Sequence, residues 1–387
     1  MEYRNVFLEC GFDKDEISKR LDDTFQEIFY KEEAFVSFNN DKSLGYIVDT
    51  GNIDVRTEGV SYAMMMCVQM DKKTEFDAIW KWALKYMYLK EGINKGYFAW
   101  SVSPDGKKNS DGPAPDGEEF MAMSLIFASH RWGDGKDECN YLNWAKKILK
   151  EVVHKGEDGI GRAMWDPDNY LIRFIPDRDF TDPSYHLPHF YELFAEYGNE
   201  EDRGFWKKAA AASREFLKKA CHPETGLSAE YSYYDGRPYP YEQEIFGRHD
   251  WFYSDAYRTI ANIALDCEWS RIRALSGDTV KDFEALEYID FEKKACKNLQ
   301  SFFAGLEEND RDKVYLIDGK ILDQKALHPV ALLATTAQAS LALEGKVSKD
   351  FVNKFWNTPL RSGERRYYDN CLYMFAMLAL SGNYRIW

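Results

Sequence analysis

Three carboxylates stand where the sequence passes from a polar loop into an apolar, helix-like segment. They are Glu58 in DVRTEGVSY, Asp116 in PAPDGEEF and Asp255 in WFYSDAYR. Acidic residues at such junctions commonly cap helices or interact with the helix dipole, so a cap and a catalytic group are equally good interpretations of each. Two carboxyl groups are also what glycosidic cleavage requires, since one protonates the leaving oxygen and the other activates water.

The surroundings of these carboxylates distinguish a candidate general acid. Glu58 precedes a wholly apolar helix face, and an enclosed setting would raise the pKa of its carboxyl group so that it keeps its proton near neutrality. Asp116, in contrast, has Glu118 and Glu119 beside it. We therefore expect Glu58 to fit the role of general acid better than Asp116.

Other chemistries find little support in the sequence. It contains no G-x-x-x-x-G-K-[ST], G-x-G-x-x-G, G-x-S-x-G or H-E-x-x-H motif. His186 and His189 in YHLPHF are three residues apart, but Pro188 lies between them and no third ligand is obvious, so polar packing is favoured over a metal site. The same histidines leave a lyase or epimerase as a remote alternative. We expect no metal and no cofactor.

The elements that must position these residues are predicted to be helices. Val60, Ala63, Met64, Cys67 and Val68 follow the spacing i, i+3, i+4, i+7, i+8, which predicts an amphipathic helix. Similar patterns predict twelve helices, near 14–30, 58–70, 74–90, 117–132, 141–154, 185–197, 202–220, 253–267, 283–304, 329–344, 348–356 and 369–381.

The connections between these helices indicate how they are arranged. Short connections alternate with long ones rich in Gly, Pro, Asp and Tyr, at 91–116, 155–184 and 221–252. Short loops make antiparallel hairpins and long loops carry functional residues. We therefore predict an all-α fold in which six hairpins close into an (α/α)6 barrel with a groove at one end, although periodicity alone leaves a plain bundle or a solenoid open. No linker divides the chain, so we predict one domain over residues 1–387.

Composition restricts the partners and the compartment. The net charge of −15 and the lack of a basic block argue against nucleic acid. The first residues are charged where an export signal would be apolar, and the longest apolar run, 372–380, is too short to span a bilayer. Seven scattered cysteines without a C-x-x-C pair indicate reduced thiols. We expect a cytoplasmic protein with no membrane partner, in which most of the aromatic residues form the core and others offer flat faces to sugar rings.

The run from Ala114 to Trp132, which begins APDGEEFMAMSL, resembles the signature of glycoside hydrolase family 8, whose members are inverting enzymes with an (α/α)6 barrel. It departs from that signature at Pro115, where Ser or Thr is usual, and at Glu118, where Asp is usual. The resemblance extends over nearly the whole chain to those members that release xylose from the reducing end of β-1,4-xylo-oligosaccharides. It is carried by DTGNIDVRTEGVSYAMMM, GYFAWSVSPDG, FASHRWGDG, DPSYHLPHFYELF, ACHPETGL, FYSDAYR, LHPVALLAT and RRYYDNCLYMFAMLALSGN.

The resemblance implies a role for each candidate residue. Glu58 matches the general acid and Asp255 the general base, Tyr185 matches a tyrosine that holds the nucleophilic water, and Asp116 matches the aspartate that binds and distorts the sugar at the cleavage point. The residues that match sugar-contacting positions are Trp100, Arg258, Tyr367 and Tyr368.

The same resemblance implies exo action. His328, in the Leu327-His328-Pro329 loop, matches a loop that closes the cleft beyond the first sugar on the reducing side. Without the resemblance this tripeptide would be interpreted as a helix entry with Pro in its first turn. Residues 238–250 differ from the pattern of the relatives and could reshape the product side.

Alternative functions remain open. An endo-acting family 8 xylanase, endoglucanase or chitosanase would use the same carboxylates, and a carbohydrate-binding protein without turnover would use the same aromatic groove.

Overall fold

The computed structural model describes residues 2–240, 242–243, 247–275 and 284–387. Thirteen α-helices lie in this described part of the chain. They are α1 (Val6–Glu9), α2 (Lys14–Phe29), α3 (Thr57–Gln69), α4 (Lys73–Tyr86), α5 (Pro115–Trp132), α6 (Tyr141–His154), α7 (Pro188–Tyr197), α8 (Arg203–Ala220), α9 (Tyr257–Leu275), α10 (Glu284–Gly305), α11 (Pro329–Gln338), α12 (Lys346–Trp356) and α13 (Arg366–Leu380).

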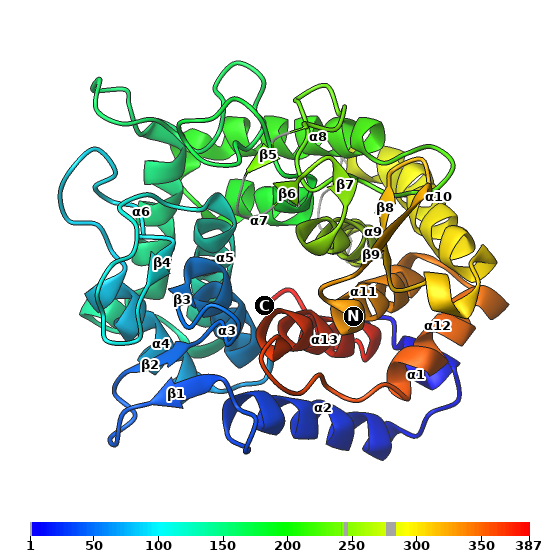
Figure 1. Cartoon of the computed structure of the whole chain (residues 1–387). Helices are drawn as coiled ribbons and strands as arrows, with labels where there is room; N and C mark the ends of the chain where they lie inside the picture. Colours follow the sequence, from blue (N-terminus) through cyan, green and yellow to red (C-terminus); the bar gives the residue numbers. More distant parts are fainter. Residues whose placement is uncertain (1, 241, 244–246, 276–283) are drawn as a thin grey trace.

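Six of these helices form a closed inner ring. α3, α5, α7, α9, α11 and α13 each pack against the next, and α13 packs back against α3 (Figure 1). The helices α4, α6, α8, α10 and α12 pack outside the inner helices that they follow, and α2 packs outside α13. This arrangement confirms the predicted (α/α)6 barrel, with α1 as a short additional helix that the sequence analysis missed.

Inner and outer helices differ in how far they are buried. In α3 every residue except Glu58 is buried, so the prediction that 58–70 is amphipathic was wrong, although the helix itself was correctly predicted. A helix enclosed by neighbours on all sides is apolar all round. The outer helix α6 instead buries a single face, formed by Tyr141, Ala145, Ile148, Leu149 and Val152.

Some helix boundaries differ from the prediction because 3₁₀ turns adjoin the helices. Residues 253–267 were predicted as one helix, but a 3₁₀ turn, η4 (Ser254–Ala256), precedes α9, which then continues to Leu275. The segment predicted as helix 329–344 leaves the α conformation after Gln338 and continues as η6 (Ala339–Ala342).

Two other predicted helix starts need comment. Another 3₁₀ turn, η2 (Pro183–Tyr185), precedes α7, which begins at Pro188 rather than at 185, because proline is favoured in a first helical turn. Residue 283, where one helix was predicted to begin, lies outside the described residues.

Short strands, which were not predicted, lie among the connections. β1 (Val36–Phe38) pairs with β2 (Gly45–Ile47), β3 (Val55–Arg56) with β4 (Ser101–Val102), and β5 (Glu242–Gln243) with β6 (Gly247–Arg248). A three-stranded antiparallel sheet has the order β7 (Trp251–Phe252), β8 (Lys313–Leu316) and β9 (Ile321–Lys325). Two of these strands lead directly into inner helices or their 3₁₀ turns: β3 into α3, and β7 towards η4.

The alternation of inner and outer helices places all the inner N-termini at one end of the barrel. Each inner helix leads away from this end of the barrel, and the outer helix that follows leads back towards it. Each long connection therefore lies at this same end and precedes the next inner helix. The candidate residues lie at these N-termini or in the connections before them: Glu58 in α3, Asp116 in α5, Tyr185 before α7, Asp255 and Arg258 around the start of α9, His328 before α11, and Tyr367 and Tyr368 in α13. Sequence positions more than 300 residues apart thus meet at one site.

None of the helices in the described ranges combines the length and the apolar character needed to cross a membrane.

Candidate active site

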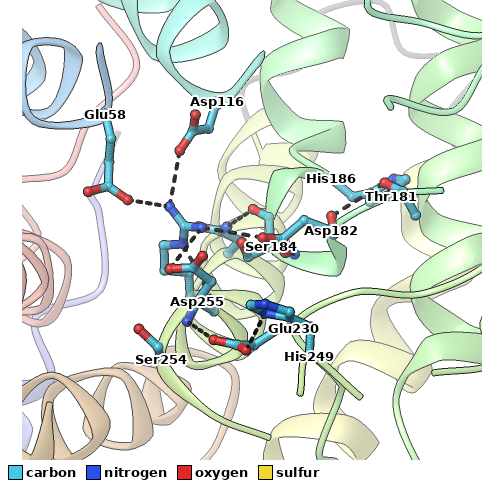
Figure 2. Close-up of polar contacts among 12 residues, drawn as sticks. Glu58, Asp116, Thr181, Asp182, Ser184, His186, Glu230, His249, Ser254 and Asp255 are labelled. Atoms are coloured by element: carbon cyan, nitrogen blue, oxygen red, sulfur yellow. Dashed lines mark hydrogen bonds and ion pairs between the residues drawn. The ribbon is translucent and has the colours of Figure 1, made fainter. Parts of the chain in front are cut away.

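Arg258, the second residue of α9, is the centre of the site. Its Nη1 donates to Glu58 Oε2 at 2.8 Å and to Asp116 Oδ2 at 3.2 Å. Its Nη2 lies 3.5 Å from both Asp182 Oδ2 and Asp255 Oδ1 (Figure 2). One largely buried guanidinium therefore contacts four carboxylates, which come from four different inner-helix N-termini or the turns before them.

Glu58 does not cap its own helix. The N-cap position of α3 is Arg56, and it makes no side-chain cap hydrogen bond. Glu58 Oε1 instead accepts a hydrogen bond from the Tyr367 hydroxyl at 2.8 Å, while Oε2 faces Arg258. Burial raises the pKa of Glu58 to about 7, Arg258 opposes this rise, and the charges of Asp116 and Asp255 add to it. This carboxyl group can therefore hold a proton near neutrality, as a general acid must.

Glycines allow this close assembly of helices. A Cβ on Gly117 would lie 2.4 Å from the Cβ of Thr57, and a Cβ on Gly59 would lie 2.6 Å from the Tyr367 hydroxyl. Contacts this short do not occur between real side chains, so only glycine fits at either position. The glycine next to Glu58 and the one after Asp116 let α3 approach α13 and α5.

Asp116 fits both interpretations that the sequence offered. Its Oδ1 accepts the backbone N–H of Gly117 at 2.9 Å in the first turn of α5, an amide that also donates to the Ala114 carbonyl at 3.0 Å, while Oδ2 accepts from Arg258. Burial raises the pKa of Asp116 to about 6, against the lowering effect of Arg258.

Asp255 is the carboxylate of this set that solvent reaches most easily. Its side chain is 32% exposed, against 15% for Glu58, 7% for Asp116 and 0% for Asp182. It lies in η4, directly after Ser254, whose φ of +37° is unusual for a residue other than glycine. A carboxylate in this setting can contact a water molecule that enters the site.

Aromatic side chains surround the guanidinium. The Tyr185 and Tyr368 rings lie 5.6 and 5.9 Å from Arg258 Cζ, and the Tyr368 hydroxyl donates to the Ser254 carbonyl at 3.2 Å. Trp100 is 37% exposed, and its carbonyl accepts from the amide of Thr57, the residue before Glu58, at 3.0 Å. Of these three rings, only that of Trp100 is exposed, while Tyr185 and Tyr368 are buried beside Arg258.

His328 lies beside the same group of residues. It occupies the N-cap position of α11, with Pro329 at the first helical position, so the helix-entry interpretation is correct as far as the backbone is concerned. Its Nδ1 shares a hydrogen bond with Asp369 Oδ2 at 2.8 Å, and its ring lies 4.7 Å from that of Tyr368. The Leu327-His328-Pro329 loop thus adjoins the turn that carries Asp255, through Tyr368.

Sequence reasoning missed three residues of this site. Asp182 is fully buried, accepts the Ser184 amide at 2.7 Å and faces Arg258; an aspartate directly before a proline was the available signal. The Tyr62 hydroxyl lies 3.0 Å from Arg258 Nη1, one helical turn after Glu58 on the same face of α3. Glu230 Oε1 accepts the backbone N–H of Asp255 at 3.3 Å, and nothing in the sequence around Glu230 pointed to this contact.

The two histidines considered as metal ligands are packing residues. His186 shares hydrogen bonds of 2.9 Å with Thr181 Oγ1 and Ser213 Oγ, and the His189 ring lies against Trp269. Burial lowers the pKa of His186 to about 3 and that of His189 to about 4. Among the described residues, no three His, Cys, Asp or Glu side chains gather as a metal site.

A buried carboxyl group with a pKa of about 7 and a more exposed carboxylate, both at one end of an (α/α)6 barrel, are the pair that a glycoside hydrolase requires. The chain belongs to glycosyl hydrolases family 8, an inverting family whose sequence profile matches residues 27–382.

Relatives within the family cover the whole chain. It is 54% identical to the reducing end xylose-releasing exo-oligoxylanase of Halalkalibacterium halodurans, over 100% of this chain and 95% of that protein. It is 50% identical to the enzyme of the same name from Bifidobacterium adolescentis, over 98% and 96% of the two chains. The solved structure of Rex8A from Paenibacillus barcinonensis, complexed with xylose, superimposes with a TM-score of 0.92 at 53% identity, over 100% of this chain and 97% of that one.

Proposed function

We propose that this protein hydrolyses β-1,4-xylo-oligosaccharides with inversion and releases xylose from the reducing end. The observation that carries the proposal is the 54% identity over the whole chain to an enzyme named for this activity. The geometry around Arg258 supports it, because it supplies an enclosed acid and an accessible base.

In the proposed reaction, Glu58 gives its proton to the glycosidic oxygen as the bond from that oxygen to C1 breaks. A water oxygen attacks C1 from the opposite face, and Asp255 takes the proton that this water loses. The product is one free xylose and a shortened chain whose new reducing end has the α configuration. In an inverting mechanism the carboxyl groups of the acid and the base, here Glu58 and Asp255, lie about 6.5–9.5 Å apart, which leaves room for the water. This chemistry needs only water and protons, so no cofactor is proposed.

Other residues of the site hold the substrate and the water. Tyr185 positions the water for Asp255. Asp116 binds the sugar at the cleavage point and stabilises its distorted ring. Arg258 also holds the carboxylates in place. The residues proposed to contact the sugars are Trp100, Arg258, Tyr367 and Tyr368.

Exo action is assigned to the loop that contains His328. His328 stands at the start of α11 and its ring lies 4.7 Å from that of Tyr368, which supports the proposal that this loop stops the chain one sugar beyond the cleavage point. Residues 238–250 are the second segment that could shape the product side, but 241 and 244–246 lie outside the described residues.

Incubation with xylotriose tests the proposal directly. We expect xylose and xylobiose in equal amounts, with the new anomer detected as α by NMR during the first minutes. Asp255→Asn and Glu58→Gln should each lower kcat by about 10²–10⁴-fold or more, since each removes one proton-transfer step. Undiminished turnover by Asp255→Asn would end the assignment of the base.

The direction of cleavage needs a second substrate. Xylotriose reduced with borohydride carries an open-chain alditol in place of its reducing sugar, and an enzyme that reads this end should not cleave it. Equal cleavage of reduced and unreduced substrates would favour the endo-acting alternative instead. Binding without any product would favour a carbohydrate-binding protein.

We also propose that the protein acts in the cytoplasm, because all seven of its cysteines are free thiols and five of them are buried. Cell fractionation with antibody detection tests this proposal, and recovery outside the cytoplasm would contradict it.

A further inference from the structure

A second buried pair of ionisable residues lies beside Asp255. Glu230 and His249 are both largely buried, and Glu230 Oε2 shares a hydrogen bond of 2.9 Å with His249 Nδ1. The other carboxyl oxygen, Oε1, accepts the backbone N–H of Asp255 at 3.3 Å (Figure 2). Glu230 thus reaches the base through the backbone amide of Asp255.

The backbone holds this pair in place. The Glu230 amide donates to the Trp251 carbonyl at 3.0 Å, and the Tyr231 amide donates to the His249 carbonyl at 2.9 Å. The His249 ring stacks on Tyr231 with 4.2 Å between centroids. The backbone of Glu230 is therefore bonded to the segment that contains His249 and Trp251. Its side chain accepts a hydrogen bond from the Asp255 amide, in the turn that follows this segment.

That turn is strained and needs support on both sides. Ser254 has a φ of +37°, in the left-handed region that residues other than glycine rarely adopt. Such a conformation persists only where neighbours impose it. The Tyr368 hydroxyl holds the Ser254 carbonyl at 3.2 Å, and Glu230 holds the next amide, that of Asp255.

The conformation of this turn decides where the Asp255 side chain points. Its carboxylate faces Arg258 Nη2 at 3.5 Å, while the α9 helix that carries Arg258 starts only at Tyr257. If the amide of Asp255 lost its acceptor, the turn could relax towards ordinary backbone angles and carry the carboxylate away from the position of the water.

We propose that Glu230, fixed by His249, is the positioning residue for Asp255: it holds the strained Ser254–Asp255 turn and so aims the base. The inference rests on the proposed role of Asp255 as general base. In this role Glu230 acts through the backbone of Asp255.

Kinetics on xylotriose test this proposal with three variants. Glu230→Ala removes the acceptor, and we expect kcat to fall by about 10²-fold with KM changed less than about threefold, because a misaimed group costs about that much while the sugar subsites stay intact. Glu230→Gln keeps an oxygen for the Asp255 amide, and the other tautomer of His249 can accept from its NH₂ group. This variant should retain activity within about fivefold of the wild type. His249→Ala should lower kcat by about tenfold.

The control removes a similar pair elsewhere in the molecule. Asp202 is buried and its Oδ1 lies 2.6 Å from His154 Nε2, between η3 (Glu200–Asp202) and the end of α6. Asp202→Ala should leave kcat within about twofold while changing the melting temperature as Glu230→Ala does. Comparing kcat of the two variants at a similar loss of melting temperature distinguishes a misplaced Asp255 carboxylate from a general loss of stability.

Three outcomes would overturn the proposal. The first is a folded Glu230→Ala with the kcat of the wild type, and the second is a Glu230→Gln as impaired as Glu230→Ala. If Glu230→Ala does not fold, His249→Ala takes its place in the test. The third outcome against the proposal is then a His249→Ala variant with the kcat of the wild type. Asp255→Asn distinguishes this failure from that of the proposed function: if Asp255→Asn is inactive while Glu230→Ala is fully active, only the positioning role is wrong.

Discussion

At the scale of single residues, the site separates two carboxyl groups by their surroundings. Glu58 is enclosed and accepts a hydrogen bond from a tyrosine hydroxyl, whereas Asp255 stands in a turn that is open to solvent. An enzyme that needs one acid and one base at the same pH must give them unequal environments. Arg258 contacts both groups through different nitrogens, so the same cation stabilises whichever of them is charged.

The raised pKa of Glu58 predicts how activity depends on pH. The proposed acid works only in its protonated form, and burial holds its pKa at about 7. As pH rises above that value the protonated fraction falls tenfold per pH unit, so kcat/KM for xylotriose should fall with a limiting slope of −1 above about pH 7. The pH profile of kcat/KM reports this value for the free enzyme. A profile that stays flat to pH 9 would contradict the assignment of Glu58.

Residue types could be predicted from the sequence, but their contacts could not. The sequence singled out Glu58, Asp116 and Asp255, yet helix capping explained each of them equally well. What distinguishes these interpretations is a contact with Arg258, which follows Glu58 by 200 positions. Asp182 was overlooked for the same reason, because its contact with Arg258 also spans a long stretch of sequence.

At the scale of elements, the first turn of α13 joins three parts of the site. Tyr367 donates to Glu58, Tyr368 donates to the carbonyl of Ser254, and Asp369 binds His328. Consecutive residues of a helix point in directions about 100° apart, so one turn can contact three different elements. The acid, the turn of the base and the loop proposed to limit the cleft are therefore all held by one helix end.

The support of the His328 loop predicts a variant with relaxed exo action. Arg361 Nη1 donates to the Leu327 carbonyl at 2.6 Å and pairs with the fully buried Asp369, which also accepts the Ala331 amide at 2.8 Å. Hydrogen bonds to a charged group contribute about 1.5–3 kcal/mol, so Arg361→Ala should raise the population of an opened loop by about 10–100-fold. We expect this variant to cleave borohydride-reduced xylotetraose, which the wild type should leave intact, as measured by chromatography.

The control for Arg361 is Arg311, which is also partly exposed, donates to two carbonyls, Leu306 and Ala304, and pairs with Glu308. Arg311→Ala should leave the product pattern unchanged. If Arg361→Ala also keeps the wild-type pattern, the loop owes its position to other contacts.

Elements differ in how far the sequence specifies them. Helices such as α6 bury one face, and this periodicity located them to within a few residues. The strands are only two to five residues long and depend on distant partners, as in the pairing of Trp251 with Leu316. In the hairpin of β8 and β9 a local signal existed: Asp318-Gly319, with Gly319 at φ +92°, is typical of a tight turn.

At the scale of the whole molecule, the N-terminal segment closes a seam of the barrel. The Arg4 guanidinium donates to the Ser340 and Leu341 carbonyls at 3.0 and 2.8 Å, in η6. Phe7 packs against Phe355 of α12. The segment before α2 thus packs against the hairpin of α11 and α12, which no local sequence pattern could predict. The closed ring followed from the count of helices and from the family resemblance.

These contacts lead us to propose that residues 1–387 unfold as one unit. Among the described residues a single cluster of buried apolar side chains extends from Val6 to Tyr384. Far-ultraviolet circular dichroism, which follows the helices, and near-ultraviolet circular dichroism, which follows the aromatic core, should therefore report one coincident thermal transition.

Arg4→Ala removes two charge-assisted bonds at the seam and should cost about 1.5–3 kcal/mol, shifting both signals together by a few degrees. Lys19→Ala, which breaks only an exposed pair with Asp23, should shift neither, since such pairs contribute about 0–1 kcal/mol. Two separate transitions, or a shift in one signal alone, would show that the barrel divides into independent parts.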